Sequence, residues 1–220
     1  MSAETQSPSP RPWMVTPDDK PNGVGPHSHP WPDDPRYDPE LLEHGDQRNV
    51  VDKYRYWTVA AIKHDLDRYR HPFHVVIENW QHDLNIGTVV RTANAFLANE
   101  VHIVGRRRWN RRGAMVTDRY QHVRHHATPE DLVEWSQRSG VPLIGIDNLP
   151  GSTPLHQTPL PSSCALVFGQ EGPGLSEAIR DVLIECRSIP QYGSTRSINA
   201  GVAAGIAMYA WVSQHVLTEG

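Results

Sequence analysis

Cysteine is scarce in this sequence, and no long apolar run is present. The 220 residues include only two cysteines, Cys164 and Cys186, too few for the disulfide framework of a small secreted domain. The longest apolar run, residues 200–212, covers 13 residues, whereas a helix needs about 20 to span a bilayer. The N-terminus carries no apolar stretch of the kind found in secretory signals. We therefore expect a cytoplasmic protein that is not embedded in a membrane.

Aliphatic residues are almost absent from the N-terminal fifth of the chain. Residues 1–47 hold 3 basic and 9 acidic residues, a net charge of 3 − 9 = −6, together with 10 of the 19 prolines. Such a segment buries too little apolar surface to offset the entropy lost on ordering. The composition predicts a disordered, acidic, proline-rich tail over residues 1–46.

The sequence pattern changes after this segment. Apolar and aromatic residues recur at a spacing near 3.6 between Arg48 and Arg70, which predicts an amphipathic N-terminal helix within residues 47–72. The His71-Pro72 pair is expected to end it, because a residue before proline avoids the helical region. The main domain is then expected to cover residues 73–220.

Strand and helix patterns alternate through this domain. Strands are expected at 74–79, 100–105, 123–128, 141–148, 164–169 and 184–190. Helices are expected at 85–98, 129–140, 174–183 and 197–216, with Gly140 as the stop of the second. Continuous apolar strands between helices indicate an α/β fold whose parallel sheet is covered on both faces.

The glycine fingerprints of common nucleotide-binding folds are missing. Neither G-x-G-x-x-G nor a P-loop occurs, which excludes the standard dinucleotide and nucleoside triphosphate sites. Polar, glycine-containing loops nevertheless follow three strands, at 79–87, 168–176 and 189–199. Ligands of parallel sheets bind beyond the carboxyl ends of the strands, so these loops are the candidate site. In the third loop Ser194 or Ser197 is suited to cap the last helix. Asn199 in the first turn of that helix has poor helix propensity, which indicates a functional position for its polar side chain.

The net charge of −4 conceals a strongly basic segment. Residues 85–126 contain 8 arginines and 2 acids, a net charge of +6, and most of it lies in RRRWNRR at 106–112. Arginine suits phosphate, and an interleaved tryptophan can stack on a base, so this segment predicts a contact with nucleic acid. His125 and His126 lack further ligands at a suitable spacing, so no metal site is expected.

Together the three loops resemble the motifs of a known enzyme family. NIGTVVRTANAF (85–96, motif 1), LVFGQEGPGLS (166–176, motif 2) and IPQYGSTRSINAGVAAGIAMY (189–209, motif 3) are similar to those of the SpoU/TrmH family, part of the SPOUT superfamily. The resemblance covers roughly residues 73–216. It implies a parallel-sheet SPOUT fold with a deep C-terminal trefoil knot. It also implies transfer of a methyl group from S-adenosyl-L-methionine to a ribose 2′-hydroxyl of structured RNA, either tRNA or rRNA.

The resemblance also implies roles for individual residues. Arg91 matches the family's essential arginine, which acts on the 2′-hydroxyl, and the other expected catalytic residues are Asn85, Glu171, Ser197 and Asn199. The expected cofactor-binding residues are Phe168, Gly169, Gly172, Ile189, Ser197 and Ile198. RNA binding is expected at Arg106, Arg107, Arg108, Trp109, Arg111 and Arg112. Family sites are assembled across a homodimer, so a homodimer with its active site at the subunit interface is expected.

The sequence also bears on RNA selection and on two other functions. The chain length leaves no space for the separate RNA-binding domain of many family members, so RNA selection is expected to rest on segments 48–70 and 106–126. A catalytically inactive RNA-binding or ribosome-assembly factor on the same fold is the alternative. The intact motif residues, Arg91 above all, argue against it. A dinucleotide-dependent dehydrogenase is excluded because its glycine fingerprint and acidic ribose partner are missing.

Overall fold

The chain forms two compact units. The computed structural model describes residues 23–80, 85–170 and 172–217, and the boundary between the units lies between Thr58 and Val59. This boundary precedes the expected domain start at residue 73, because helix α2 (Val59–Asp67) belongs with the second unit.

A buried acid organises the described part of the first unit, residues 23–58. Asp46 has no exposed surface, and its carboxylate accepts hydrogen bonds from Arg48 Nη2 at 2.7 Å and from the backbone N–H of Tyr56 at 3.0 Å. Burial opposes ionisation, but these hydrogen bonds outweigh it and hold the pKa of the Asp46 carboxyl below its ordinary value. Val24 and Asp46 also exchange two backbone hydrogen bonds of 2.9 Å.

The expectation of disorder over residues 1–46 is therefore wrong for residues 23–46. They include helix α1 (Pro39–His44), whose N-cap is Asp38. Aliphatic residues are scarce here, and the unit is held together by aromatic and polar contacts instead. For example, the Arg36 guanidinium lies 4.5 Å from the ring centroid of the buried Trp57. Residues 1–22 of the expected tail lie outside the described residues.

The expected helix over residues 47–72 is also shorter than predicted. A 3-10 turn, η1 (Asp52–Tyr54), precedes α2, and Tyr56 between them has a left-handed backbone with φ 61°. That conformation interrupts a right-handed helix. The Arg48 guanidinium also donates to the Trp57 carbonyl at 2.8 Å, which stabilises a turn in this segment.

A seven-stranded parallel sheet forms the centre of the second unit, in the order β3-β2-β1-β6-β4-β7-β5. The α/β prediction with a parallel sheet is confirmed, and each of the six predicted strands is found. The strands are β1 (Phe73–Asn79), β2 (Val101–Gly105), β3 (Val123–His126), β4 (Leu143–Ile146), β5 (Thr153–Pro154), β6 (Cys164–Phe168) and β7 (Glu185–Ser188). The two-residue β5 was not predicted, because it is too short to show a pattern.

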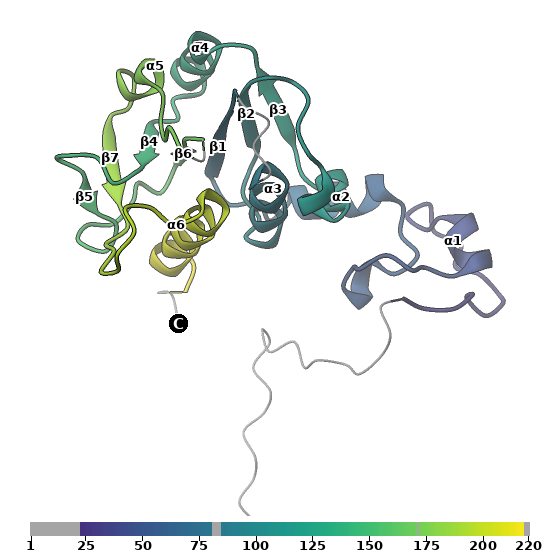
Figure 1. Cartoon of the computed structure of the whole chain (residues 1–220). Helices are drawn as coiled ribbons and strands as arrows, with labels where there is room; N and C mark the ends of the chain where they lie inside the picture. The colour runs from purple at the N-terminus through teal and green to yellow at the C-terminus, as the bar shows by residue number, and fades with distance from the viewer. Residues whose placement is uncertain (1–22, 81–84, 171, 218–220) are drawn as a thin grey trace, which may run out of the picture. The chain divides into compact units, whose positions relative to one another are not determined.

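Helices cover both faces of the sheet (Figure 1). On one face α3 (Asn85–Ala95) and α6 (Ala200–His215) lie side by side, and on the other are α4 (Pro129–Ser139) and α5 (Glu177–Arg180). Gly140 ends α4 with φ 67°, as predicted. α5 is shorter than the expected 174–183, since Gly174 has φ 71° and Ser176 caps the helix only from Glu177 on.

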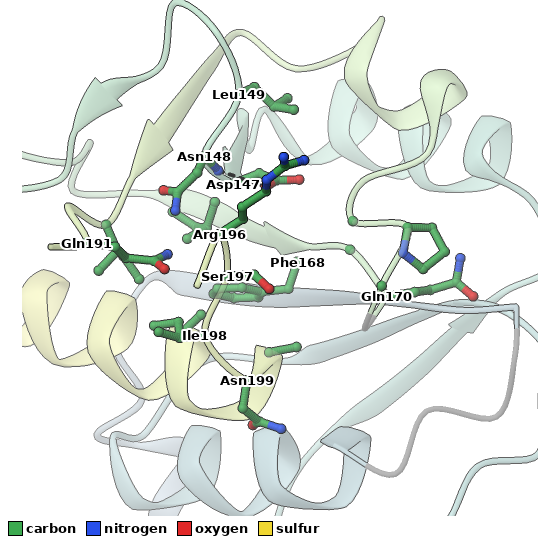
Figure 2. Close-up of a pocket in the computed structure, with 18 of the residues that line it drawn as sticks. Asp147, Asn148, Leu149, Phe168, Gln170, Gln191, Arg196, Ser197, Ile198 and Asn199 are labelled. Carbon is green, nitrogen blue, oxygen red and sulfur yellow. Dashed lines mark hydrogen bonds between the residues drawn. The ribbon is translucent and has the colours of Figure 1, made fainter. Parts of the chain in front are cut away.

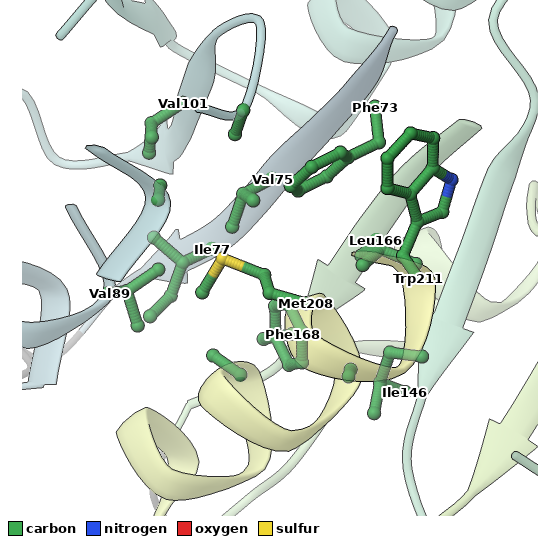
Figure 3. Close-up of a cluster of buried hydrophobic side chains, with 14 of the residues drawn as sticks. Phe73, Val75, Ile77, Val89, Val101, Ile146, Leu166, Phe168, Met208 and Trp211 are labelled. Carbon is green, nitrogen blue, oxygen red and sulfur yellow. The ribbon is translucent and has the colours of Figure 1, made fainter. Parts of the chain in front are cut away.

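The core lies in two layers because successive strand residues point to opposite faces. Val75 and Ile77 pack with α3 and α6, whereas Val76 packs with α4 and α5. In the first layer the rings of Phe73 and Trp211 lie 4.6 Å apart (Figure 3). None of the helices in the described residues is long and apolar enough to cross a membrane.

Candidate active site

A cavity of about 330 Å³ opens where β4, β6 and β7 end (Figure 2). Most of its lining residues come from the segments that follow these three strands, within 146–149, 168–170, 172–174 and 189–200, and Arg180 and Ala203 complete it. Its position at the carboxyl ends of parallel strands is the one predicted for a ligand site. The lining residues are Ile146, Asp147, Asn148, Leu149, Phe168, Gly169, Gln170, Gly172, Pro173, Gly174, Arg180, Ile189, Gln191, Arg196, Ser197, Ile198, Asn199, Ala200 and Ala203.

Described residues of the loop after β6 line the cavity, and its two ends are joined by backbone hydrogen bonds. Gln170 and Gly174 exchange two backbone hydrogen bonds of 3.1 and 3.0 Å. A Cβ at Gly169 would lie 2.0 Å from the carbonyl carbon of Gly174, so only glycine fits there. Gly172 has φ 96°, with no heavy atom within 4 Å of where a Cβ would stand. The loop can therefore offer backbone N–H and C=O groups to a ligand.

Asn199 joins the third loop to motif 1. Its Oδ1 accepts hydrogen bonds from the backbone N–H groups of Gly201 at 2.9 Å and Val202 at 3.2 Å, which makes it the N-cap of α6. Its Nδ2 donates to Oδ1 of the buried Asn85 at 2.9 Å. The expectation that Ser194 or Ser197 caps the helix is wrong, because the helix starts later than the polar pattern indicates.

The structure brings together most of the predicted cofactor-binding and catalytic residues. Each of the six predicted cofactor residues lines the cavity, as does Asn199, and Asn85 is in contact with Asn199. Glu171 lies outside the described residues. Arg91 is exposed on α3 and is not one of the residues lining the cavity of its own chain.

A buried glutamate that the sequence analysis missed connects β1 to the second loop. Glu78 has no exposed surface, and its carboxylate accepts hydrogen bonds from Trp80 Nε1 and from the backbone N–H of Ser176, both at 2.8 Å. The Trp80 backbone N–H in turn donates to Oε1 of Gln170 at 3.2 Å. The single carboxylate of a strand that is buried along its whole length is the signal that could have identified it. Asp147, Asn148, Arg180, Gln191 and Arg196 were also missed as lining residues.

The arginine-rich segment 106–112 forms a loop fixed to motif 1. Nδ2 of the buried Asn79 donates to the carbonyls of Arg106 at 2.7 Å and Arg108 at 2.9 Å. A Cβ at Gly87 of α3 would lie 2.8 Å from the Cα of Gly113, so the two backbones touch directly. The five predicted RNA-binding arginines are exposed, whereas Trp109 is half-buried against the core.

Three buried histidines form a chain across the first three strands. His102 lies between the other two. Its Nε2 is 3.0 Å from Nδ1 of His74, and its Nδ1 is 2.9 Å from Nε2 of His126. Burial lowers the pKa of His74 to about 4 and that of His102 to about 2, and the Arg124 charge acts in the same direction. The three imidazoles are therefore neutral at pH 7.

Two of these histidines and a neighbouring glutamate carry atoms that could ligate a metal ion. Ligand atoms of His74, Glu100 and His102 lie within 4.8 Å of one another. Arg124 Nε already donates to Oε2 of Glu100 at 3.0 Å, and both imidazoles are hydrogen-bonded. We therefore assign these residues a structural role. None of them lines the cavity.

Comparison with known proteins gives consistent matches. Residues 72–209 match the model of the SpoU rRNA methylase family. A protein of Mycobacterium ulcerans (strain Agy99) described as an uncharacterized tRNA/rRNA methyltransferase is 33% identical over 141 residues, which are 61% of this chain and 44% of that protein. The chain thus spans less than half the length of this curated relative.

Solved structures match the same part of the chain. The SpoU methyltransferase AviRb from Streptomyces viridochromogenes, in complex with AdoMet, is 25% identical with a TM-score of 0.60, covering 67% of this chain and 59% of AviRb. A structure described by the words "Structural insights into the 2-OH methylation of C/U34 on tRNA" is 26% identical with a TM-score of 0.58. That match covers 68% of this chain and 99% of the other.

Proposed function

The chain belongs to the SpoU rRNA methylase family, and from this premise we propose that it methylates a ribose 2′-hydroxyl of structured tRNA or rRNA, using S-adenosyl-L-methionine. The observation that carries the proposal is the convergence of motifs 2 and 3 on one cavity that Asn199 links to motif 1. We expect the reaction to take place in the cytoplasm, where both RNA classes are available.

The residues around the cavity fit the cofactor. Its volume of about 330 Å³ falls in the range of about 300–1,000 Å³ that is usual for small-molecule sites. Backbone groups of Gly169, Ile189 and Ile198 would hold the adenosine, and Phe168 offers an apolar surface beside them. The AviRb structure holds AdoMet on the same fold. When bound, the cofactor supplies an electrophilic methyl group.

Arg91 is the residue we propose to act on the RNA hydroxyl. A guanidinium stays protonated because its pKa exceeds about 12, so Arg91 cannot be the base. It instead orients the 2′-hydroxyl and stabilises the developing alkoxide, while an RNA phosphate accepts the proton. Asn85, Glu171, Ser197 and Asn199 shape the pocket in which this occurs.

A homodimer would bring Arg91 to a cavity. The Arg91 side chain is exposed and forms no hydrogen bond or ion pair with another described residue. On the neighbouring α6, Val202 is 54%, Ile206 40% and Tyr209 55% exposed. Apolar patches of this kind mark interfaces. We infer that α6 packs on a second copy and that Arg91 of one subunit serves the cavity of the other.

The remaining parts of the proposal concern the knot and the RNA contact. The segment leading into α6 lines the same cavity as the loops after β4 and β6, which supports the deep trefoil knot inferred from the family. The close contact of Gly87 with Gly113 holds the arginine loop beside motif 1. This proximity supports RNA binding at Arg106, Arg107, Arg108, Trp109, Arg111 and Arg112.

The decisive experiment combines cofactor binding with methyl transfer. We expect calorimetry to detect binding of S-adenosyl-L-methionine and the purified protein to transfer labelled methyl groups to tRNA or rRNA fractions. Mapping of the product should place the label on a ribose 2′-oxygen. Binding of RNA without either cofactor binding or transfer would overturn the proposal in favour of an inactive RNA-binding factor.

A further inference from the structure

A second cavity, of about 470 Å³, lies between α2 and the arginine loop. It is separate from the cofactor cavity, with which it shares no lining residue. Its walls come from α2, from β2 and β3, and from the segment between these two strands. The lining residues are Lys63, Ile103, Arg107, Trp109, Arg111, Asp118, Arg119, Gln121, Val123 and His125.

Arg70 explains why α2 forms one wall of this cavity. Its guanidinium donates to the carbonyl of Tyr120 at 2.8 Å, to that of Ala98 at 3.2 Å, and to Oε1 of the buried Gln121. Asp67 at the end of α2 also pairs with His122 at 2.8 Å. These contacts attach the end of α2 to the segment before β3, and Lys63 thereby reaches the cavity.

The charge of the cavity is strongly positive. Lys63, Arg107, Arg111 and Arg119 face one carboxylate, that of Asp118, which lies 3.5 Å from Arg111 Nη1. The side chains of Lys63, Arg107 and Arg119 form no ion pair or hydrogen bond with any other described residue. Cations gathered around a hollow repel one another and attract an anion.

An aromatic ring provides the second feature of the cavity. Trp109 packs against the hydrophobic core on one side, and the Arg111 guanidinium lies 5.5 Å from its ring centroid. Planar guanidinium and indole groups are the surfaces on which unpaired RNA bases stack. The cavity thus combines cationic groups, which suit the phosphate of a nucleotide, with a planar surface, which suits its base.

We propose that this cavity binds one nucleotide of the substrate RNA, other than the nucleotide that is methylated. The phosphate lies among Lys63, Arg107 and Arg119, and the base lies against the Arg111–Trp109 pair. The proposal rests on the proposed function in so far as RNA is the substrate. It adds α2 and Arg119 to the RNA-binding surface and gives this surface a pocket.

The test uses the full chain with Lys63→Gln and Arg119→Gln, and Arg138→Gln as the control. Arg138 lies on α4 with its side chain 69% exposed and outside the cavity, so its loss changes the net charge equally. Loss of one charged contact should weaken RNA binding about tenfold for each cavity variant and lower the salt slope by about one. Arg138→Gln should change neither, and cofactor affinity should stay the same in all three.

Competition shows what the cavity binds. Uridine monophosphate should displace the RNA from the wild-type protein at a lower concentration than inorganic phosphate or uridine, and Arg119→Gln should remove this difference. Equal displacement by phosphate and uridine monophosphate would overturn the nucleotide site, as would unchanged RNA affinity in both cavity variants. Weakened RNA binding by a protein that methylates no RNA would support the cavity and refute the enzyme. Normal RNA affinity in cavity variants that still methylate RNA would refute the nucleotide site and support the enzyme.

Discussion

The side-chain amide of Asn199 donates a hydrogen bond of 2.9 Å to the Oδ1 of Asn85, a residue 114 positions earlier in the chain. Each asparagine stands at the start of a helix, Asn85 at α3 and Asn199 at α6. One amide thus fixes the first turn of motif 1 against the first turn of the motif 3 helix.

Replacement of Asn199 should separate stability from catalysis. Asn199→Ala removes the N-cap of α6 and the bond to Asn85, which should lower the free energy of unfolding by about 1–3 kcal/mol in urea titration. Asn199→Asp keeps the capping oxygen and loses the donor. We expect it to lose less stability than Asn199→Ala and to methylate RNA more slowly. Equal stability of the Ala variant and the wild type would contradict the capping role.

Arg91→Ala should slow methyl transfer about 100- to 1,000-fold, because it removes the group that stabilises the developing alkoxide. Arg91 is exposed, so the free energy of unfolding should change by less than about 0.5 kcal/mol. Calorimetry should show nearly unchanged affinity for S-adenosyl-L-methionine. Arg91→Lys serves as the control that keeps the charge and loses the planar fork. Simultaneous loss of cofactor binding and activity would refute the assigned role.

Mixed dimers test whether the site crosses the subunit interface. A subunit with Arg91→Ala keeps its cavity, and one with Ile198→Glu, a residue lining the cavity, keeps its arginine. Unfolding, mixing and refolding the two inactive variants should restore about a quarter of the wild-type activity, since half the dimers then hold one complete site. Sites confined to single subunits would yield no recovery.

The apolar face of α6 can be tested separately by light scattering. Ile206→Glu places a charge on the exposed face and should convert the dimer to a monomer that lacks activity. Ile184→Glu, at a residue that is 64% exposed outside α6, is the matched control and should leave the dimer intact. A wild-type protein that is monomeric and active would exclude the cross-subunit site.

Stability should decline in mild acid because of the buried histidines. The pKa of His74 falls from 6.5 in the unfolded chain to about 4, and that of His102 to about 2. Below pH 6.5 the unfolded chain therefore binds more protons than the folded one, and stability is lost as the pH falls. Each histidine should cost about 2 kcal/mol at pH 4.5 relative to pH 7.5, measured by urea titration.

The control for this pH dependence is His74→Gln, whose unfolding free energy should fall less between pH 7.5 and pH 4.5. Asp46 acts in a different window, because its lowered pKa contributes stability that is fully present above its ordinary value of 3.8 and is lost as the pH falls below that value. A pH profile that is flat between 7.5 and 4.5 would contradict neutral burial of the histidine chain.

Glu78→Gln should loosen the second loop. The glutamine amide offers one acceptor where Glu78 accepts two N–H donors, so either Trp80 Nε1 or the Ser176 N–H loses its partner. We expect a loss of about 1–3 kcal/mol in unfolding free energy and weaker binding of S-adenosyl-L-methionine. Glu177→Gln, exposed one residue after Ser176, is the control. Unchanged cofactor affinity in Glu78→Gln would show that Glu78 does not support the cofactor-binding loop.

Sequence reasoning was most successful where local pattern and burial agree. The central strands β4 and β6 are continuous apolar runs because both faces of the sheet are covered, and such runs are recognisable in the sequence alone. The order of residues 23–46 could not be predicted in this way, because Asp46 is stabilised by hydrogen-bond partners that the composition does not reveal. The Asn85–Asn199 bond and the second cavity depend on segments that only the tertiary structure brings together.

The contact between Gly87 and Gly113 has a consequence for how RNA would be selected. With no side chain between the two backbones, the arginine loop lies directly against the helix that carries Arg91. We therefore expect the protein to set the distance between a phosphate bound by the arginine loop and the ribose at Arg91. RNAs whose backbone spacing differs would be held but not modified, so shape rather than affinity would decide which nucleotide receives the methyl group.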